Sequence, residues 1–190
     1  MRENSVAATG LTSRILPDVA ELESWKHCPR CGTGIEPLDD GARIECPECG
    51  FRSYASSKPT ASGLVLDGER ILLARRAQEP DQGKWDLPGG FLNEGEDPRD
   101  GLRRELREEA SLDVEPLELF DVVVDRYGDD DDAQWTLNLY WTCRVLGGNP
   151  TPADDVDELR WFARDEVPPP AELAFRNNAK VIARWRDEHA

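Results

Sequence analysis

Residues 90–112 read GFLNEGEDPRDGLRRELREEASL, a glycine-rich loop followed by a charged segment with helical spacing. Residues three and four apart share one face of a helix, so Glu105, Glu108 and Glu109 are expected to project toward one region of space. Ionised carboxylates that crowd together repel one another unless solvent or a cation intervenes. Hard cations such as Mg²⁺ prefer oxygen ligands and bind carboxylates together with substrate phosphates. The stretch therefore favours a divalent-metal site for phosphate chemistry.

The alternative interpretation is a solvated helix face. Glu and Arg are good helix formers, and Arg103, Arg104 and Arg107 can neutralise the neighbouring acids. Charge runs usually face water, so the helix taken alone leaves both interpretations open. Asp97 and Pro98 predict where this helix begins, with aspartate as the N-cap and proline at the first position. The apolar residues Leu102, Leu106 and Ala110 are expected to face a core.

The flanks of this helix decide between the two interpretations, because the whole stretch resembles the Nudix box. That pattern is glycine, five residues, Glu, seven residues, Arg-Glu, an aliphatic residue, any residue, Glu-Glu, any residue, glycine and an aliphatic residue. The matching positions are Gly90, Glu96, Arg104, Glu105, Leu106, Glu108, Glu109 and Leu112. Ser111 departs from the pattern, since it stands where the family has glycine. A left-handed conformation after a helix is cheap only for glycine, so the departure concerns the local turn more than the metal site.

The resemblance implies an α/β protein, with the Nudix α/β/α sandwich built around a mixed sheet. It implies hydrolysis of a phosphoric anhydride with catalytic Mg²⁺ or Mn²⁺. The metal ligands it implies are the Gly90 carbonyl, Glu105, Glu108 and Glu109. The same three glutamates and Arg104 form the expected catalytic group, in which Arg104 orients its acidic neighbours. We expect Glu96 to hold the loop by a salt bridge to the helix.

Several other residues are candidates for the site. A further acid, Asp154, Asp155 or Glu158, is a candidate general base, and the sequence does not select among the three. Substrate contacts are expected from Arg76, Trp85 and Tyr127. For Trp85 and Tyr127 the alternative is packing in the core, and for Arg75 we expect simple solvent exposure.

Two C-x-x-C pairs precede this domain, HCPRCG at residues 27–32 and CPECG at residues 46–50. Four thiolates at such spacing predict a closed, structural Zn²⁺ site made of Cys28, Cys31, Cys46 and Cys49. A pair of disulfides is the competing interpretation, but nothing in the sequence indicates secretion. The fifth cysteine, Cys143, lies in a strand pattern and is expected to be a buried apolar residue.

The predicted organisation is an N-terminal segment over residues 1–24, a zinc ribbon over 25–57 and a Nudix domain over 58–190. A short helix is expected from Asp18 to Trp25. Asp67-Gly68 between two apolar runs predicts a hairpin. A second, longer hairpin is expected from residues 114–127 and 134–148, with the acidic run 129–132 as a solvated turn. A closing helix is expected within residues 168–190, and its core candidates are Phe175, Val181, Ile182 and Trp185.

The expected substrate is a nucleoside diphosphate linked to another moiety, with ADP-ribose as the default. A zinc ribbon before a Nudix domain is similar to the NADH pyrophosphatase arrangement, but residues 119–128, LFDVVVDRYG, lack that family's downstream Ser-Gln-Pro-Trp-Pro stretch. The ADP-ribose hydrolase proline is absent as well, and Tyr127 lies near where diadenosine-polyphosphate hydrolases place a tyrosine. NADH and diadenosine polyphosphates are the alternative substrates. A non-catalytic nucleotide sensor that binds a macromolecule through its ribbon is the alternative of another class.

The composition bears on partners and compartment. A formal net charge of −16 argues against nucleic acid or an anionic membrane as a general partner. No apolar run is long enough to span a membrane, and no signal-peptide core is present, so we expect a cytoplasmic protein. A homodimer remains possible.

Overall fold

A computed structural model describes residues 21–128 and 134–188. The chain divides into two compact units, residues 1–55 and 56–190. Of the helix predicted from Asp18, the part before Glu21 lies outside the described residues, and the rest is a 3-10 helix, η1, at Glu21–Ser24. The acidic run 129–132 also lies outside the described residues. The domain boundaries expected at residues 24 and 57 stay predictions.

The first unit is a small metal-ribbon-like module. Its strands β1 (Arg43–Glu45) and β2 (Arg52–Tyr54) pair antiparallel. A small core forms where Leu22, Ile35 and Ile44 pack with two of the cysteines and with half-buried aromatic residues. Within the described residues 21–55 this core has five buried members, and a core that small commonly needs a metal or another cross-link.

The second unit contains a seven-stranded mixed sheet. Its strands are β3 (Lys58–Asp67), β4 (Arg70–Arg76), β5 (Trp85–Asp86), β6 (Gly89–Phe91), β7 (Leu112–Tyr127), β8 (Gln134–Gly148) and β9 (Val156–Ala163). The main path runs β5-β4-β3-β8-β7, with β6 paired to β3 and β9 to β4. The β3–β8 pair is parallel and the other pairs are antiparallel, which makes the sheet mixed as predicted.

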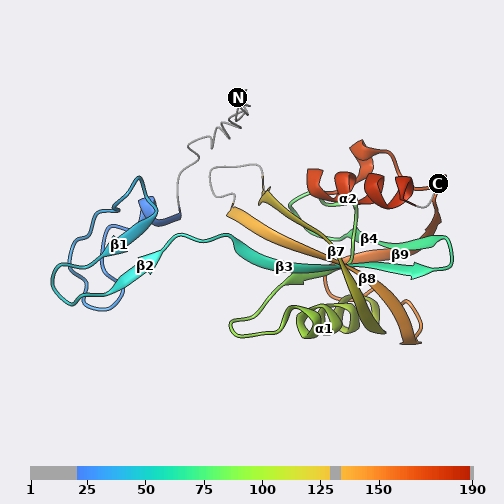
Figure 1. The fold of residues 1–190 in the computed structure, drawn as a ribbon, viewed down its shortest axis with the longest axis horizontal. Coiled ribbons are helices and arrows are strands. Elements are labelled where there is room, and N and C mark those ends of the chain that lie inside the picture. The colour runs from blue at the N-terminus through green and yellow to red at the C-terminus, as the bar shows by residue number, and fades with distance from the viewer. Residues whose placement is uncertain (1–20, 129–133, 189–190) are drawn as a thin grey trace, which may run out of the picture. The chain divides into compact units, whose positions relative to one another are not determined.

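One helix covers each face of this sheet (Figure 1). Helix α1 (Pro98–Ala110) packs Leu102, Leu106 and Ala110 onto one face, and all three are fully buried. Helix α2 (Arg176–Asp187) packs onto the other face, preceded by the short 3-10 helix η2 (Pro170–Glu172). Successive residues of a strand point to opposite faces, so β3 and β4 contribute buried apolar residues to both cores. The predicted α/β/α sandwich is confirmed.

The local predictions are confirmed with one exception. Asp97 caps α1 by accepting from the Arg99 amide, and Pro98 is the first helical residue. The β3–β4 hairpin turns at Gly68, and β7 pairs along β8. Cys143 is buried, and burial raises the pKa of its thiol to about 12. The prediction for Phe175 is wrong, because it precedes α2 and lines a cavity, whereas the other three candidates of that helix are in the core.

No helix in the described part of the chain is long and apolar enough to cross a membrane.

Ser111 adopts the left-handed conformation that the glycine of the pattern would favour, with φ of 55° and ψ of 33°. We expect Ser111→Gly to raise the free energy of unfolding by about 1 kcal/mol, because a residue with a Cβ is strained there. Denaturant unfolding measures the change. Ser111→Ala is the matched control and should bring no gain, since it keeps the Cβ. Equal stability of the glycine and alanine variants would contradict this account.

Candidate active site

A cavity of about 280 Å³ opens in the second unit. Its walls come from β3, β4, β5, the glycine loop (Gly89 and Gly90, at the start of strand β6), α1, the end of β7, the loop before β9 and the beginning of α2. The floor is polar, because β3 and β8 present three buried polar side chains there. Thr60 donates to the Asn138 side-chain oxygen over 2.8 Å, and Asn138 donates to Thr136 over 2.9 Å. These hydrogen bonds hold the three side chains in fixed orientations relative to one another.

The glycine loop presses directly onto helix α1. A Cβ on Gly90 would lie 2.7 Å from the carboxyl carbon of Glu105, so a side chain there would displace that carboxylate. Gly89 has φ of 143°, and a Cβ on it would lie 2.2 Å from the Ala61 carbonyl oxygen. In this position the Gly89 amide donates to Glu109 over 3.0 Å. The two glycines therefore bring the backbone of the loop and two helix carboxylates together.

Three acids share this end of the cavity. Glu109 is buried, and it lines the cavity together with Glu105 and Asp155. Burial raises the pKa of Glu109 well above its usual value, and the nearby Asp155 carboxylate raises it further. Burial also raises the pKa of Glu105, against the opposing effect of Arg104. Carboxyl groups that resist ionisation in this way form a site that favours a cation.

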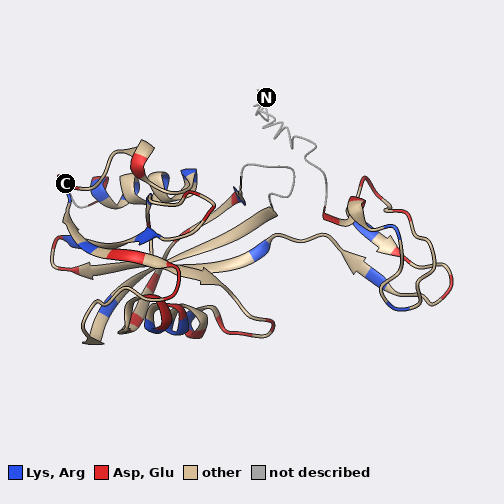
Figure 2. Cartoon of the chain, turned by 180° about the vertical axis from the view of Figure 1, so that it is seen from behind, with Lys and Arg blue, Asp and Glu red and all other residues tan. Residues whose placement is uncertain are grey.

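Arg104 binds three of the acids around it at this face of α1. Its guanidinium donates to Glu96 over 2.8 Å and to Glu105 over 2.7 Å. It also donates to Glu108 over 3.1 Å and to the Phe91 carbonyl over 3.2 Å. The expected salt bridge from Glu96 to the helix is therefore present, and Arg104 lowers the pKa of Glu96 to about 2. Figure 2 shows acidic and basic residues side by side along this helix.

The three helix glutamates are not equivalent in this arrangement. Glu105 and Glu109 line the cavity, whereas Glu108 does not, and about half of its side chain is exposed. Arg104 bridges Glu105 and Glu108 and so neutralises part of their charge. The helical spacing had predicted one shared region for all three acids. In the structure Glu109 is more deeply buried than Glu108 and lies against the glycine loop.

The other end of the cavity is aromatic and cationic. Arg76 and Tyr127 both line it, as does Phe175, and the Tyr127 hydroxyl lies 3.4 Å from the Arg76 guanidinium. The expected contact from Trp85 has no support, because Trp85 packs edge-on against Phe162 with centroids 4.9 Å apart and does not line the cavity. Its bulky ring fits the apolar layer under α2 better than a polar cavity.

Of the three candidate bases, two line the cavity and one does not. Asp154 and Asp155 line the cavity, while Glu158 pairs with Arg75 over 3.1 Å. The loop that carries the two aspartates is tied to the end of α1, since Ala153 donates to the Glu109 carbonyl over 3.0 Å. Arg75, which we expected to be simply exposed to solvent, is partly exposed and also forms this ion pair.

Sequence reasoning missed a buried polar group behind Arg76. Asp86 accepts from Arg76 over 3.1 Å and from the Asn178 amide, and Asn178 accepts from Tyr140 over 3.1 Å. Burial raises the pKa of Asp86 to about 6, although Arg76 opposes this. The doublet Asn177-Asn178 in the first turn of α2 was the available signal, since buried asparagine side chains need hydrogen-bond partners.

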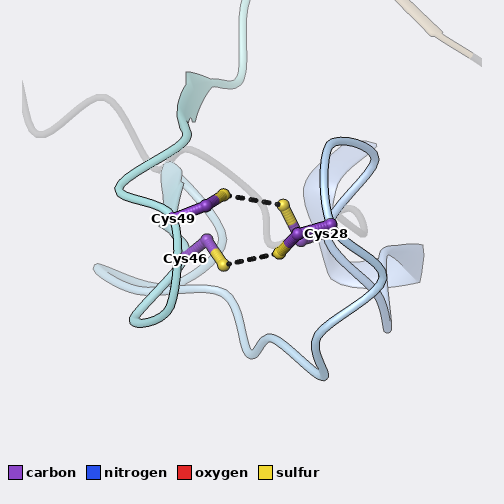
Figure 3. A group of neighbouring side chains, drawn as sticks. Cys28, Cys46 and Cys49 are labelled. Carbon is purple, nitrogen blue, oxygen red and sulfur yellow. Dashed lines mark hydrogen bonds between the residues drawn. The ribbon is translucent and has the colours of Figure 1, made fainter.

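The four cysteines of the first unit come together as predicted (Figure 3). Their Sγ atoms all lie within 4.8 Å of one another, and the Cys28–Cys49 and Cys31–Cys46 separations are both 3.6 Å. Tetrahedral zinc with Zn–S bonds of about 2.3 Å sets sulfur atoms about 3.8 Å apart. A disulfide would need about 2.05 Å. The cluster therefore has the dimensions of a four-thiolate metal site, and the cysteines are free thiols rather than disulfides.

The two halves of this cluster repeat one backbone pattern. The backbone amides of Cys28 and Cys46 each donate to the carbonyl oxygen five residues later, over 2.8 Å in both cases. Gly32 and Gly50 each donate back to the first cysteine of their pair, and both have positive φ. Each C-x-x-C pair is thus a tight turn that ends in a glycine with positive φ.

The cavity, the glycine loop and the acidic helix belong to a segment with a family match. The model of the NUDIX domain matches residues 56–185. The chain belongs to the NUDIX family. A NUDIX hydrolase from Nitrosomonas europaea has a similar structure, with a TM-score of 0.72 and 28% identity, covering 86% of this chain and 92% of that one. A MutT NUDIX hydrolase from Burkholderia pseudomallei gives a TM-score of 0.60 and 25% identity, covering 67% and 97%.

Relatives by sequence include the NAD-capped RNA hydrolase NudC of Pseudomonas aeruginosa. It is 29% identical over 149 residues, which is 76% of this chain and 50% of the relative. The protein of the same name from Pseudomonas fluorescens is 26% identical over 182 residues, 90% of this chain and 59% of the relative. The NUDIX chain thus spans between half and three fifths of the length of these relatives. All four of these proteins are hydrolases by name, which agrees with the predicted family.

Proposed function

We propose that this NUDIX chain hydrolyses the phosphoric anhydride bond of a nucleoside diphosphate linked to another moiety, with a divalent cation at the acidic end of its cavity. One observation carries the proposal. Glu105, Glu109 and Asp155 line a single cavity, and burial and mutual repulsion already hold the pKa of Glu109 well above its usual value. A cation and an anionic diphosphate together would complete such a site, because hard cations bridge carboxylates and phosphates.

The chain's own groups suit Mg²⁺ or Mn²⁺. Glu105 and Glu109 offer carboxylate oxygens, and Gly90 offers its carbonyl, from a loop in direct contact with Glu105. The bound cation would orient the diphosphate, neutralise developing charge and lower the pKa of the attacking water. Glu108 is a ligand or water activator only if its carboxylate leaves Arg104, to which it is bound over 3.1 Å. Arg104 then holds Glu96 and Glu105 in place.

For the general base, position favours the aspartate pair over Glu158. Asp155 is half-buried in the cavity and close enough to raise the pKa of Glu109, whereas the Glu158 carboxylate is bound to Arg75. A carboxylate beside the attacking water can take its proton. We therefore propose Asp155 as the base.

We propose a structural Zn²⁺ in the four-cysteine cluster. The sulfur separations of 3.6 Å fit four thiolates around one ion, and four protein ligands leave no open position for catalysis. The small core of this unit gives a second reason, because such modules commonly fold only with their metal.

ADP-ribose remains the default substrate, and NAD-type dinucleotides are a second candidate. The names of the NudC relatives favour the second, while the missing Ser-Gln-Pro-Trp-Pro stretch opposes strong selection for it. The names of the NudC relatives also weaken the expectation that nucleic acid is not a partner. The net charge of −16 supports that expectation. Retention of every box acid opposes the sensor alternative. Cytoplasmic location and a homodimer stay predictions.

The test is a hydrolysis screen with and without Mg²⁺ over ADP-ribose, NADH, diadenosine polyphosphates, nucleotide sugars and nucleoside triphosphates. We expect Mg²⁺-dependent cleavage of several nucleoside diphosphate derivatives. A preference for NADH over ADP-ribose above about a hundredfold in kcat/KM, or roughly 2.7 kcal/mol, would overturn the default substrate. Asp155→Asn should reduce turnover on the best substrate, with Asp157→Asn, an exposed neighbour, as the matched control. No Mg²⁺-dependent cleavage of any of them would favour the sensor.

A further inference from the structure

Phe175 has an unusual backbone for a bulky residue. Its φ is 56° and its ψ is 141°, outside the left-handed helical region and in a part of conformational space that glycine occupies readily. Such conformations persist only where the surrounding structure enforces them, and they gather at ligand sites. The sequence offers no local reason for this conformation, since the next residues begin an ordinary helix.

A specific contact holds the Phe175 backbone in place. The Phe175 amide donates to the Asp81 carboxylate over 3.0 Å, across 94 positions of the chain. Asp81 also binds Lys84 over 2.6 Å. Burial acts to raise the pKa of Asp81, but Lys84 and the Phe175 amide outweigh it and lower the pKa below its usual value. Asp81 is therefore an ionised anchor for the turn before α2.

The Phe175 ring is held where a ligand can reach it. It is half-buried and lines both the active-site cavity and an adjoining cavity of about 590 Å³. The Arg76 guanidinium lies 5.0 Å from its centroid, and the Tyr127 ring lies 5.3 Å away at an angle of 31°. Phe91, from the glycine loop, meets Tyr127 edge-on at 5.3 Å and is 40% exposed. An aromatic surface thus stands in the same cavity as the acids.

We propose that Phe175, with Tyr127, is the stacking platform for a planar heteroaromatic ring of the substrate, a nucleobase or a nicotinamide, and that Asp81 positions it. This rests on the proposed function for the identity of the ligand class. Aromatic side chains bind such rings by stacking, largely independently of which base is present. Asp86 and Arg76 support the platform from behind, because Arg76 is bound to Asp86 and to the Pro80 carbonyl. In this arrangement Arg76 supports the Phe175 ring rather than binding the substrate phosphates.

The test compares three small ligands by calorimetry without divalent metal, so that no hydrolysis is needed. They are AMP, nicotinamide mononucleotide and ribose 5-phosphate, which is AMP without its base. We expect the wild-type protein to bind AMP or nicotinamide mononucleotide at least about tenfold more tightly than ribose 5-phosphate. Tighter binding of either ligand supports the platform, because stacking tolerates different rings. Phe175→Leu should remove most of this preference while leaving ribose 5-phosphate affinity unchanged.

Control variants separate stacking from folding. Leucine keeps a Cβ and so keeps the same backbone strain as phenylalanine. Phe175→Trp should retain the preference, and so should Phe120→Leu, which changes a half-buried ring outside the cavity. Asp81→Ala should lower the preference, and Asp81→Asn should restore part of it because its side-chain oxygen can still accept from the Phe175 amide.

Three outcomes would overturn the proposal. They are no wild-type preference for the base-bearing ligands, an unchanged preference in Phe175→Leu, or its loss in Phe175→Trp as well. An unchanged preference in Asp81→Ala would overturn the positioning role. Failure of the hydrolysis screen would leave these binding results intact, so the two proposals are tested separately.

Discussion

Glu109→Gln should lower turnover on the best substrate by about a hundredfold or more, the scale of losing one preorganised electrostatic stabiliser. Glu109 is the most buried acid of the cavity, and its carboxylate already accepts from the Gly89 amide. Glutamine keeps an oxygen for that hydrogen bond but carries no charge for a cation. Steady-state kinetics with saturating Mg²⁺ measure the effect.

The stability of the same variant should move the other way. A carboxyl group whose pKa is raised in the folded state binds a proton more tightly when folded, so it destabilises the fold as pH rises from about 4.5 through the folded pKa. Glutamine lacks this effect, and the melting temperature at neutral pH without Mg²⁺ should therefore stay level or rise. Adding Mg²⁺ should raise the melting temperature of the wild-type protein more than that of the variant.

Glu118→Gln is the matched control, because Glu118 is exposed on β7 and lies outside the cavity. It should change neither turnover nor the response to Mg²⁺. The solvated-face interpretation of α1 predicts near-normal turnover for Glu109→Gln and a small loss of stability. That result would refute the metal site, and with it the reading of residues 90–112.

Replacing Cys46 and Cys49 together with serine should abolish zinc binding, from about one ion per chain to none. The two residues supply half of a cluster whose ligand atoms lie within 4.8 Å of one another. Structural zinc sites contribute their binding free energy to folding, so the first unit should lose its protection against hydrogen exchange. Metal analysis and exchange measured over residues 21–55 check both expectations.

The second unit should keep its own protection, because its two apolar clusters contain no residue of the first. Cys143→Ala is the matched control: it removes a buried cysteine that lies outside the cluster, and zinc content should stay at about one. Zinc at about one ion per chain in the double serine variant would show that the four cysteines do not form the site.

The sequence alone determined the elements whose cause is local. Asp97 and Pro98 begin α1 because a carboxylate satisfies a free amide and proline needs no donor there. The C-x-x-C spacing brings the two thiolates of each pair together, because each pair is one tight turn. The salt bridge of Glu96 with Arg104 and the core face of α1 also follow from short-range spacing.

Only the tertiary structure decided the depth of each acid and the character of the far end of the cavity. Helical spacing makes Glu105, Glu108 and Glu109 neighbours, but Glu109 is buried against the Gly89 amide, whereas Glu108 is half exposed and bound to Arg104. Asp155 and Phe175 reach the cavity from loops distant in sequence, and the anchor of Phe175 is 94 positions away. Contacts of this kind leave no periodic pattern in the chain, because they depend on which loops the sheet brings together.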